Sequence, residues 1–407
     1  MEGGAFFQGK EPGPISDPVS HYAPKLNLLE RRARDFLQAR DHGGPRTPLT
    51  QADLAALRAI RNRAVMLAAL SGTISGILIG GTEVYLRLVV LNGDESRSLI
   101  DDPWLWAAFY AGVGVLTVIE IAFLYWNALR AITRIGGVVG VSMKSGSGSN
   151  LLATGLARSA LEMPNPQTEI YGIDPYALMP RWRLLIQNLL YKAKVGATSF
   201  VLRILLRRIF ARAVLRGYIP LLAIPLYAIW NAVITWRVMR EARLRALAPF
   251  AVDQIVRRIE TALPDPSQNV RCTLLHGAGE IVRRGSDAHP SYVLLLSHLL
   301  DVLGFKEEEI DVDWERTRRE FQALPQDARR QIARILAMCA LVAGRPRSAQ
   351  RELVAELHEM ANLELPAKAL AQMHGRMIDG QPFAPGDDDD PARLHGSGTS
   401  VIDPPPA

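Results

Sequence analysis

Three ionisable side chains interrupt the most apolar part of the sequence. Glu83 and Arg87 stand four residues apart, so on one helix they would share a face and could form an ion pair. Glu120 has no such neighbour and comes nine residues before Leu129, where the second apolar run ends. An acidic group deep in a membrane is a candidate for moving protons or ions. The alternative is that Glu120 reaches the headgroups at the nearby end of the run.

A set of arginines lies within positions 175–240, where no acidic residue occurs. On a helical projection of 200–216, apolar side chains share one face and guanidinium groups occupy the rest. These are Arg203, Arg207, Arg208, Arg212 and Arg216. A helix of this design lies in a headgroup layer, and each basic group near an anionic leaflet contributes about 1 kcal/mol. The segment predicts binding to anionic membrane lipids. Nucleic acid is not expected as a partner, because no recognition motif accompanies the arginines.

No group of side chains in the sequence has the spacing of a catalytic or metal site. The histidines are scattered and are expected to be structural: His276, His289, His298, His358 and His374. The glycine-rich stretch 136–150 fails as a phosphate loop because Met143 stands where a glycine should precede Lys144, and we interpret it as a hinge. We therefore expect no catalytic residue, no metal, no cofactor and no enzymatic activity.

Two long apolar runs must position Glu83, Arg87 and Glu120. They cover 64–91 and 104–129, and each exceeds the roughly 20 residues that a helix needs to cross a bilayer. The short, turn-rich link between them predicts a helical hairpin. Arginines precede the first run and follow the second, whereas the link is mostly acidic, so both ends of the hairpin are expected in the cytoplasm. The alternative is a hairpin buried in a soluble core.

Small residues give the first run a flat face, because Gly72, Gly76 and Gly80 recur at every fourth position. Such a face lets another helix backbone approach closely. It could bind a partner or a second copy of the chain, or it could pack the two spans together. The packing interpretation is favoured.

A third apolar run, 219–237, follows the arginine helix and could just span a bilayer. Arginines flank both of its ends, so charge assigns it no direction. Pro220 and Pro225 are expected to kink or break a helix there. A re-entrant or interfacial segment is favoured, with a third span as the close alternative.

The middle of the chain carries motifs of a known family. Gly136-Gly137, then ALEMPNPQTEIYGIDPYAL, KVGATSF and YIPLLAIPLYAIWN, resemble the bacterial EcsC-type membrane-associated proteins. The resemblance covers roughly 130–245 and rests on small and apolar motifs. It implies an accessory protein of the bacterial inner membrane and transfers no catalytic residue.

From Phe250 onward, charges of both signs mix with leucines at helical spacing. Amphipathic helices are expected near 251–263, 270–284, 290–303, 313–323, 326–342, 347–361 and 366–378. The stretches 281–305 and 340–365 resemble each other at an offset of about 58 residues, which suggests a duplicated helical hairpin.

This unit resembles the TerB-like fold, an all-helical module of bacterial stress-associated proteins. In that family the loops commonly carry acidic residues that are linked with metal binding. Here the first loop keeps Asp287, whereas the second has Glu352 but no aspartate. Oxygen-ligand sites need several acidic groups. The unit is therefore expected to bind a protein partner rather than a metal.

The expected fold class is all-α: a transmembrane helical hairpin, a basic amphipathic or re-entrant region and a C-terminal TerB-like helical bundle. The expected units are a flexible or helical cytoplasmic segment 1–60, the hairpin 61–130, the EcsC-like region 131–247, the bundle 248–380 and a disordered tail 381–407. Charged residues are 22% of the 407 and the net charge is +6, so the chain is neither disordered nor uniformly membrane-buried. Only Cys272 and Cys339 occur, which indicates a reducing compartment.

Two functions are compatible with these patterns. The first is a multi-pass adaptor or scaffold of the bacterial inner membrane, with cytoplasmic N- and C-terminal regions, that recruits an unknown cytoplasmic protein through 250–380. The second is a component of a transport or channel assembly, built on Glu120 and the glycine face, and a homo-oligomer would suit either one.

Overall fold

The structure is a computed structural model that describes residues 26–40, 48–90, 102–143, 148–165, 169–180, 182, 219–305, 310, 312–366 and 368–383. Within these ranges the chain forms eleven α-helices, one short π-helical segment and no strand, which confirms the all-α prediction. The arginine helix 200–216 and the terminal tails lie outside the described residues.

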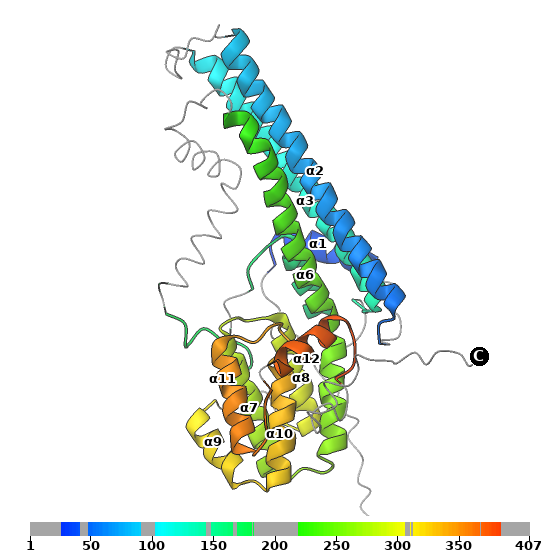
Figure 1. The fold of residues 1–407 in the computed structure, drawn as a ribbon, viewed down its shortest axis with the longest axis vertical. Helices are drawn as coiled ribbons and strands as arrows, with labels where there is room; N and C mark the ends of the chain where they lie inside the picture. Colours follow the sequence, from blue (N-terminus) through cyan, green and yellow to red (C-terminus); the bar gives the residue numbers. More distant parts are fainter. Residues whose placement is uncertain are drawn as a thin grey trace, which may run out of the picture.

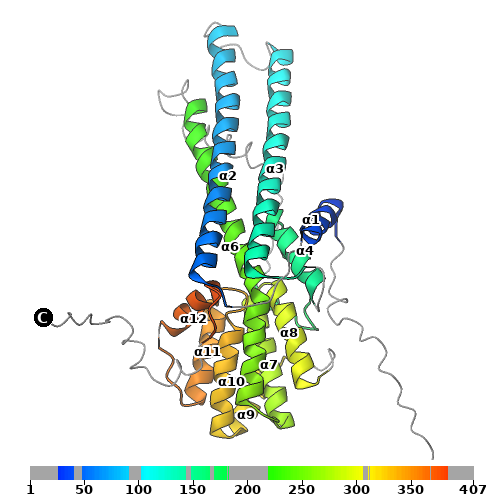
Figure 2. The ribbon, with the colours of Figure 1, turned by 90° about the vertical axis from the view of Figure 1, so that its right-hand side faces the viewer.

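Three long helices form an arm that projects from a helical bundle (Figures 1 and 2). They are α2 (Gln51–Tyr85), α3 (Pro103–Val139) and the upper half of α6 (Ile219–Ala262). Helix α2 runs away from the bundle and continues as the π-helical segment Leu86–Val90, whereas α3 and α6 run back toward the bundle. The arm therefore consists of two antiparallel helices, α2 and α3, and a third helix, α6, packed along α2.

Local sequence signals set the ends of the hairpin helices. Helix α2 begins with a capping box, in which the Thr50 side chain accepts a hydrogen bond from the backbone N–H of Asp53 and the Asp53 carboxylate accepts one from Thr50 N–H. Helix α3 begins at Pro103, which suits a first turn where no backbone donor is needed. It ends at Gly140, whose φ of 73° is a left-handed conformation that glycine adopts easily.

Two short helices, α1 (Leu28–Ala39) and α4 (Ser149–Ala160), pack against the base of the arm (Figure 2). One apolar core joins them to α3 and α6 and includes the fully buried Leu37, Ile132 and Leu156. An ion pair of 2.9 Å between Arg158 Nη1 and Glu30 Oε1 ties α4 to α1.

The C-terminal bundle contains six further helices. These are α7 (Gln268–Gly285), α8 (Pro290–Leu303), α9 (Trp314–Ala323), α10 (Gln326–Cys339), α11 (Ser348–Met360) and α12 (Ala369–Ile378). Each end lies within three residues of the range predicted from hydrophobic periodicity, so the periodicity prediction is confirmed for these six. Their apolar faces meet the lower half of α6 in one continuous core.

Helix α6 is continuous from the arm into the bundle, which differs from the sequence expectation in two ways. Of the kink or break expected at Pro220 and Pro225, a break does not occur, and the expected boundary between 247 and 248 falls inside the helix. Pro220 is the second residue of α6, in the first turn, where its missing N–H costs nothing. Pro225 lies inside the helix, where packing along α2 offsets the missing backbone hydrogen bond.

The two hairpins of the expected duplication share local geometry at a constant offset of 58 positions. Ser286 and Gly344 both have left-handed backbones, with φ of 49° and 110°. His289 and Arg347 are the N-caps of the following helices, α8 and α11. The agreement is in backbone conformation, whereas the residue types at these paired positions differ, and the duplication stays a prediction.

Candidate functional site: the three-helix arm and its junction with the bundle

The surface of the arm is apolar. Helices α2 and α3 are the two described helices that are long and apolar enough to cross a membrane, and only 11% of the apolar window of α3 is buried. Large exposed apolar side chains cover all three helices: Met66, Leu70, Ile74, Ile77 and Leu78 on α2, Val115, Val118 and Ile119 on α3, and Ile229 and Val233 on α6. An exposed patch of this extent suits lipid, whereas a hairpin in a soluble core would bury it.

Tryptophans and arginines mark the two ends of this apolar surface. Trp104, 87% exposed, lies near the far end of α3, and Trp126, 46% exposed, lies toward the bundle. The separation of 22 positions between them corresponds to about 33 Å of helix, close to the roughly 30 Å thickness of a bilayer core. Amphipathic rings at that separation match the two interfaces of one membrane.

A basic collar surrounds the arm at its bundle end. It consists of Arg58, Arg61, Arg63, Arg130, Arg134, Arg237 and Arg240, contributed by α2, α3 and α6. The guanidiniums of Arg130 and Arg240 lie 5.3 and 5.9 Å from the ring centroids of Trp126 and Trp236.

The charges of the collar act across helices. Burial lowers the pKa of the Arg243 guanidinium; Asp379 opposes this shift, and the positive charges of Arg61 and Arg58 add to it. The charges of Arg58 and Arg61 on α2 therefore reach Arg243 of α6, which follows the collar by three residues and is paired with Asp379.

The polar residues within the apolar runs differ from one another in their contacts. The Glu120 carboxylate accepts a 2.6 Å hydrogen bond from Asn231 Nδ2 of α6, a partner that sequence reasoning missed. The sequence does contain a sign of this contact, because Asn231 is a polar residue inside the apolar run 219–237 and needs a hydrogen-bond partner there. Glu83 is buried in the arm, and the side chain of Arg87 lies outside the described residues, so the expected Glu83–Arg87 pair stays a prediction.

The glycine face packs against α6, and not against α3 as the sequence interpretation favoured. A Cβ on Gly72 would lie 2.6 Å from the backbone oxygen of Tyr227, and one on Gly76 would lie 2.9 Å from Ile224 Cα. Gly80 is also buried. The interpretation failed because contiguity in sequence suggested α3, whereas α6 presents its backbone to this face.

Helix α3 packs on α2 through a polar contact nearer the bundle. The buried side chain of Asn127 donates a 2.9 Å hydrogen bond from Nδ2 to the carbonyl oxygen of Ala64. Hydrogen bonds from asparagine side chains commonly link neighbouring helices in membrane proteins. Gly112 of α3 has no heavy atom of the described residues within 4 Å of an added Cβ, so no neighbour packs closely against it there.

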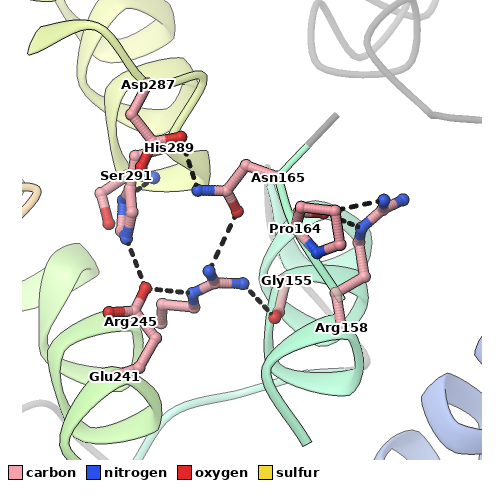
Figure 3. A network of polar contacts seen from close by, with 9 residues as sticks. All are labelled: Gly155, Arg158, Pro164, Asn165, Glu241, Arg245, Asp287, His289 and Ser291. Carbon is pink, nitrogen blue, oxygen red and sulfur yellow. Dashed lines mark hydrogen bonds and ion pairs between the residues drawn. The ribbon is translucent and has the colours of Figure 1, made fainter. Parts of the chain in front are cut away.

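A polar network joins the arm to the bundle (Figure 3). At its centre, Arg245 of α6 is 4% exposed and bonds three groups. Its Nε donates to Glu241 Oε1 at 2.9 Å, its Nη2 donates to Asn165 Oδ1 at 3.0 Å, and its Nη1 donates to the carbonyl oxygen of Gly155 in α4. One guanidinium therefore links α6, α4 and the segment after α4.

The network continues into the start of α8. His289 Nδ1 accepts from the backbone N–H of Ser291, so the neutral ring carries its proton on Nε2 and donates to Glu241 Oε1 at 2.9 Å. Burial opposes ionisation of Glu241, but the His289 hydrogen bond and the charge of Arg245 hold the pKa of this carboxyl well below its usual range. The carboxylate is thus the shared acceptor between arm and bundle.

Asp287, the acidic residue expected in the first TerB-like loop, belongs to the same network. It accepts a 2.9 Å hydrogen bond from Asn165 Nδ2. Among the described residues no group of three or more His, Cys, Asp or Glu side chains could hold a metal ion. Of the histidines, His276, His358 and His374 are also buried. Asp287 therefore serves the contact between the segment after α4 and the bundle.

The fold and the site define an all-helical protein with two candidate membrane-spanning helices and a polar junction beneath them. Comparison of the chain with protein-family models, with curated proteins and with solved structures found no match.

Proposed function

We propose that this protein is a membrane-anchored adaptor of the bacterial inner membrane. In this proposal the three-helix arm, α6 included, lies in the bilayer, the basic collar faces the anionic cytoplasmic leaflet, and the helical bundle binds a soluble protein. The observation that carries the proposal is the exposed apolar surface of the arm, which ends at a collar of arginines beside the bundle. The arginine helix 200–216 is proposed to add to the same attachment.

The proposed role of the bundle is binding rather than catalysis. Two of the pockets in the described part of the chain border the junction, and each has a volume of about 10 Å³, room for a water molecule. The proposed EcsC-like and TerB-like relationships agree with an adaptor. Their support remains the sequence motifs and the repeated loop geometry at an offset of 58.

Labelling of single cysteines tests the anchoring half of the proposal. In a chain with Cys272→Ser and Cys339→Ser, we expect Ser96→Cys to react with a membrane-impermeant maleimide in intact cells. Ser286→Cys, at the end of α7, is expected to react only after the membrane is permeabilised. Ser96→Cys reacting only from the cytosol, or release of the protein by high salt alone, would refute the topology.

Crosslinking in native membranes tests the adaptor half. We expect photoreactive residues on the exposed faces of α9 and α11 to capture a soluble cytoplasmic protein. The matched control places the same residue at Val118, on the apolar surface of α3. Capture of only further copies of this chain by the bundle would replace the adaptor with a homo-oligomer.

A transport or channel component is the second candidate, because the arm contains Glu120. The Glu120 carboxylate accepts a hydrogen bond from Asn231, and this contact between α3 and α6 needs only an acceptor oxygen. A glutamine at position 120 supplies such an oxygen without the charge. We therefore expect Glu120→Gln to leave thermal stability in detergent unchanged and Glu120→Leu to lower it. Ion or proton flux through reconstituted vesicles that Glu120→Gln abolishes would instead establish transport, which needs the ionised carboxylate.

A further inference from the structure

Part of the basic collar lines a pocket between α2 and α3. The pocket has a volume of about 30 Å³ and opens between Arg63 of α2 and Arg130 and Arg134 of α3, with Trp126 on its membrane side. On α3 the residues 126, 130 and 134 recur at every fourth position, so the ring and both guanidiniums lie on one helix face. Ala64 and Ala131 contribute small side chains to its lining.

The three guanidiniums carry uncompensated charge. Arg63, Arg130 and Arg134 are exposed, and none of them forms an ion pair with an acidic side chain of the described residues. Arginines elsewhere in the structure have carboxylate partners, such as Arg158 with Glu30 and Arg284 with Glu280. Guanidinium groups bind phosphate oxygens in a forked, bidentate geometry, so three of them around one pocket favour a phosphate group.

The surroundings of the pocket distinguish a lipid from a free anion. The exposed side chains of Met66 and Leu70 follow Arg63 along α2, and the partly exposed Trp126 lines the pocket from α3. A phosphate held by the arginines would therefore have an apolar surface directly beside it, where acyl chains can lie. Free phosphate would leave that surface without a partner.

We infer that this pocket, lined by Arg63, Trp126, Arg130 and Arg134, is a binding site for the headgroup of an anionic glycerophospholipid. The inference rests on the proposed placement of the arm in a membrane and adds a defined lipid site to it. The headgroup phosphate lies between the guanidiniums, the Trp126 ring lies at the glycerol level, and the acyl chains lie along the exposed apolar side chains of α2, such as Met66 and Leu70.

Native mass spectrometry of the full chain in mild detergent tests the site, with phosphatidylglycerol and phosphatidylcholine as probes. We expect selective retention of phosphatidylglycerol. Replacing the pocket arginines (Arg63→Gln, Arg130→Gln, Arg134→Gln) is expected to weaken binding of the first phosphatidylglycerol by at least about tenfold. The matched control removes the same charge from the collar outside the pocket (Arg58→Gln, Arg61→Gln, Arg237→Gln), and its expected effect is clearly smaller than that of the pocket variant, because these residues do not line the pocket.

Each outcome decides the inference. Equal loss in both variants would show that the collar attracts lipid only diffusely, and no loss in either would show that lipid binds elsewhere; both overturn the site. Displacement of the lipid by excess inorganic phosphate would make it a site for a free anion. If the triple variant does not fold, Arg130→Gln alone is expected to reduce binding by about fivefold. Alkaline extraction of the same membranes separates this inference from the proposed membrane anchoring. If the wild-type protein stays in the bilayer after extraction but shows no preference for phosphatidylglycerol, the lipid site is refuted and the anchoring is not.

Discussion

Replacing Arg245 with methionine is expected to lower the free energy of unfolding by about 3–5 kcal/mol. Methionine keeps much of the aliphatic volume but removes all three hydrogen bonds of the buried guanidinium. The carbonyl oxygen of Gly155 and the side-chain oxygen of Asn165 then lose their donor, and Glu241 loses its charged partner and keeps only His289. A buried acceptor without a donor is unfavourable by more than the hydrogen bond itself stabilises.

Urea unfolding of the full chain in detergent, followed by helical circular dichroism, measures this loss. The matched control is Arg316→Met, because the Arg316 side chain is 55% exposed and pairs with Glu320 on the surface of α9. That exposed pair should contribute less than about 1 kcal/mol. A double-mutant cycle of Arg245→Met with Glu241→Gln should give a coupling energy above about 1 kcal/mol. Equal shifts for Arg245→Met and Arg316→Met would contradict the central role of Arg245.

Replacing Gly72 with alanine should separate α6 from α2. The added Cβ would lie 2.6 Å from the backbone oxygen of Tyr227, 2.8 Å from its carbonyl carbon and 2.9 Å from Asn231 Nδ2. Because two of these atoms belong to the backbone, no change of side-chain rotamer relieves the clash, and the helices must move apart. We expect destabilisation of about 1–3 kcal/mol and a fall of about 2–5 °C in the thermal unfolding midpoint in detergent.

The chain provides a matched control for this substitution. Gly112 lies in α3 of the same arm and has nothing within 4 Å of an added Cβ. Gly112→Ala makes the same chemical change in a helix, so it brings the same gain in helix propensity without the clash. Its unfolding midpoint should stay the same or rise slightly. If Gly72→Ala were as stable as Gly112→Ala, the close approach of α2 and α6 would be wrong.

The helices of this protein follow from local sequence signals. Thr50 and Asp53 form the capping box of α2, Pro103 starts α3 and Gly140 ends it. Leucine periodicity located the six helices of the bundle to within three residues, because burying one face of each helix is the dominant local constraint. Apolar length and arginine placement were also sufficient to predict a hairpin that exposes lipid-compatible surface.

The tertiary structure decided which surfaces meet. The glycines of α2 predict that another helix packs closely there but do not identify that helix. In the structure it is α6 and not the neighbouring α3. Glu120 and Asn231 are 111 positions apart, and no spacing rule connects them. Arg245, Asn165 and His289 form the junction only because three segments converge there. Secondary structure depends on residues that are close together in the chain. These contacts depend instead on packing between distant segments, and no local pattern in a single sequence encodes that packing.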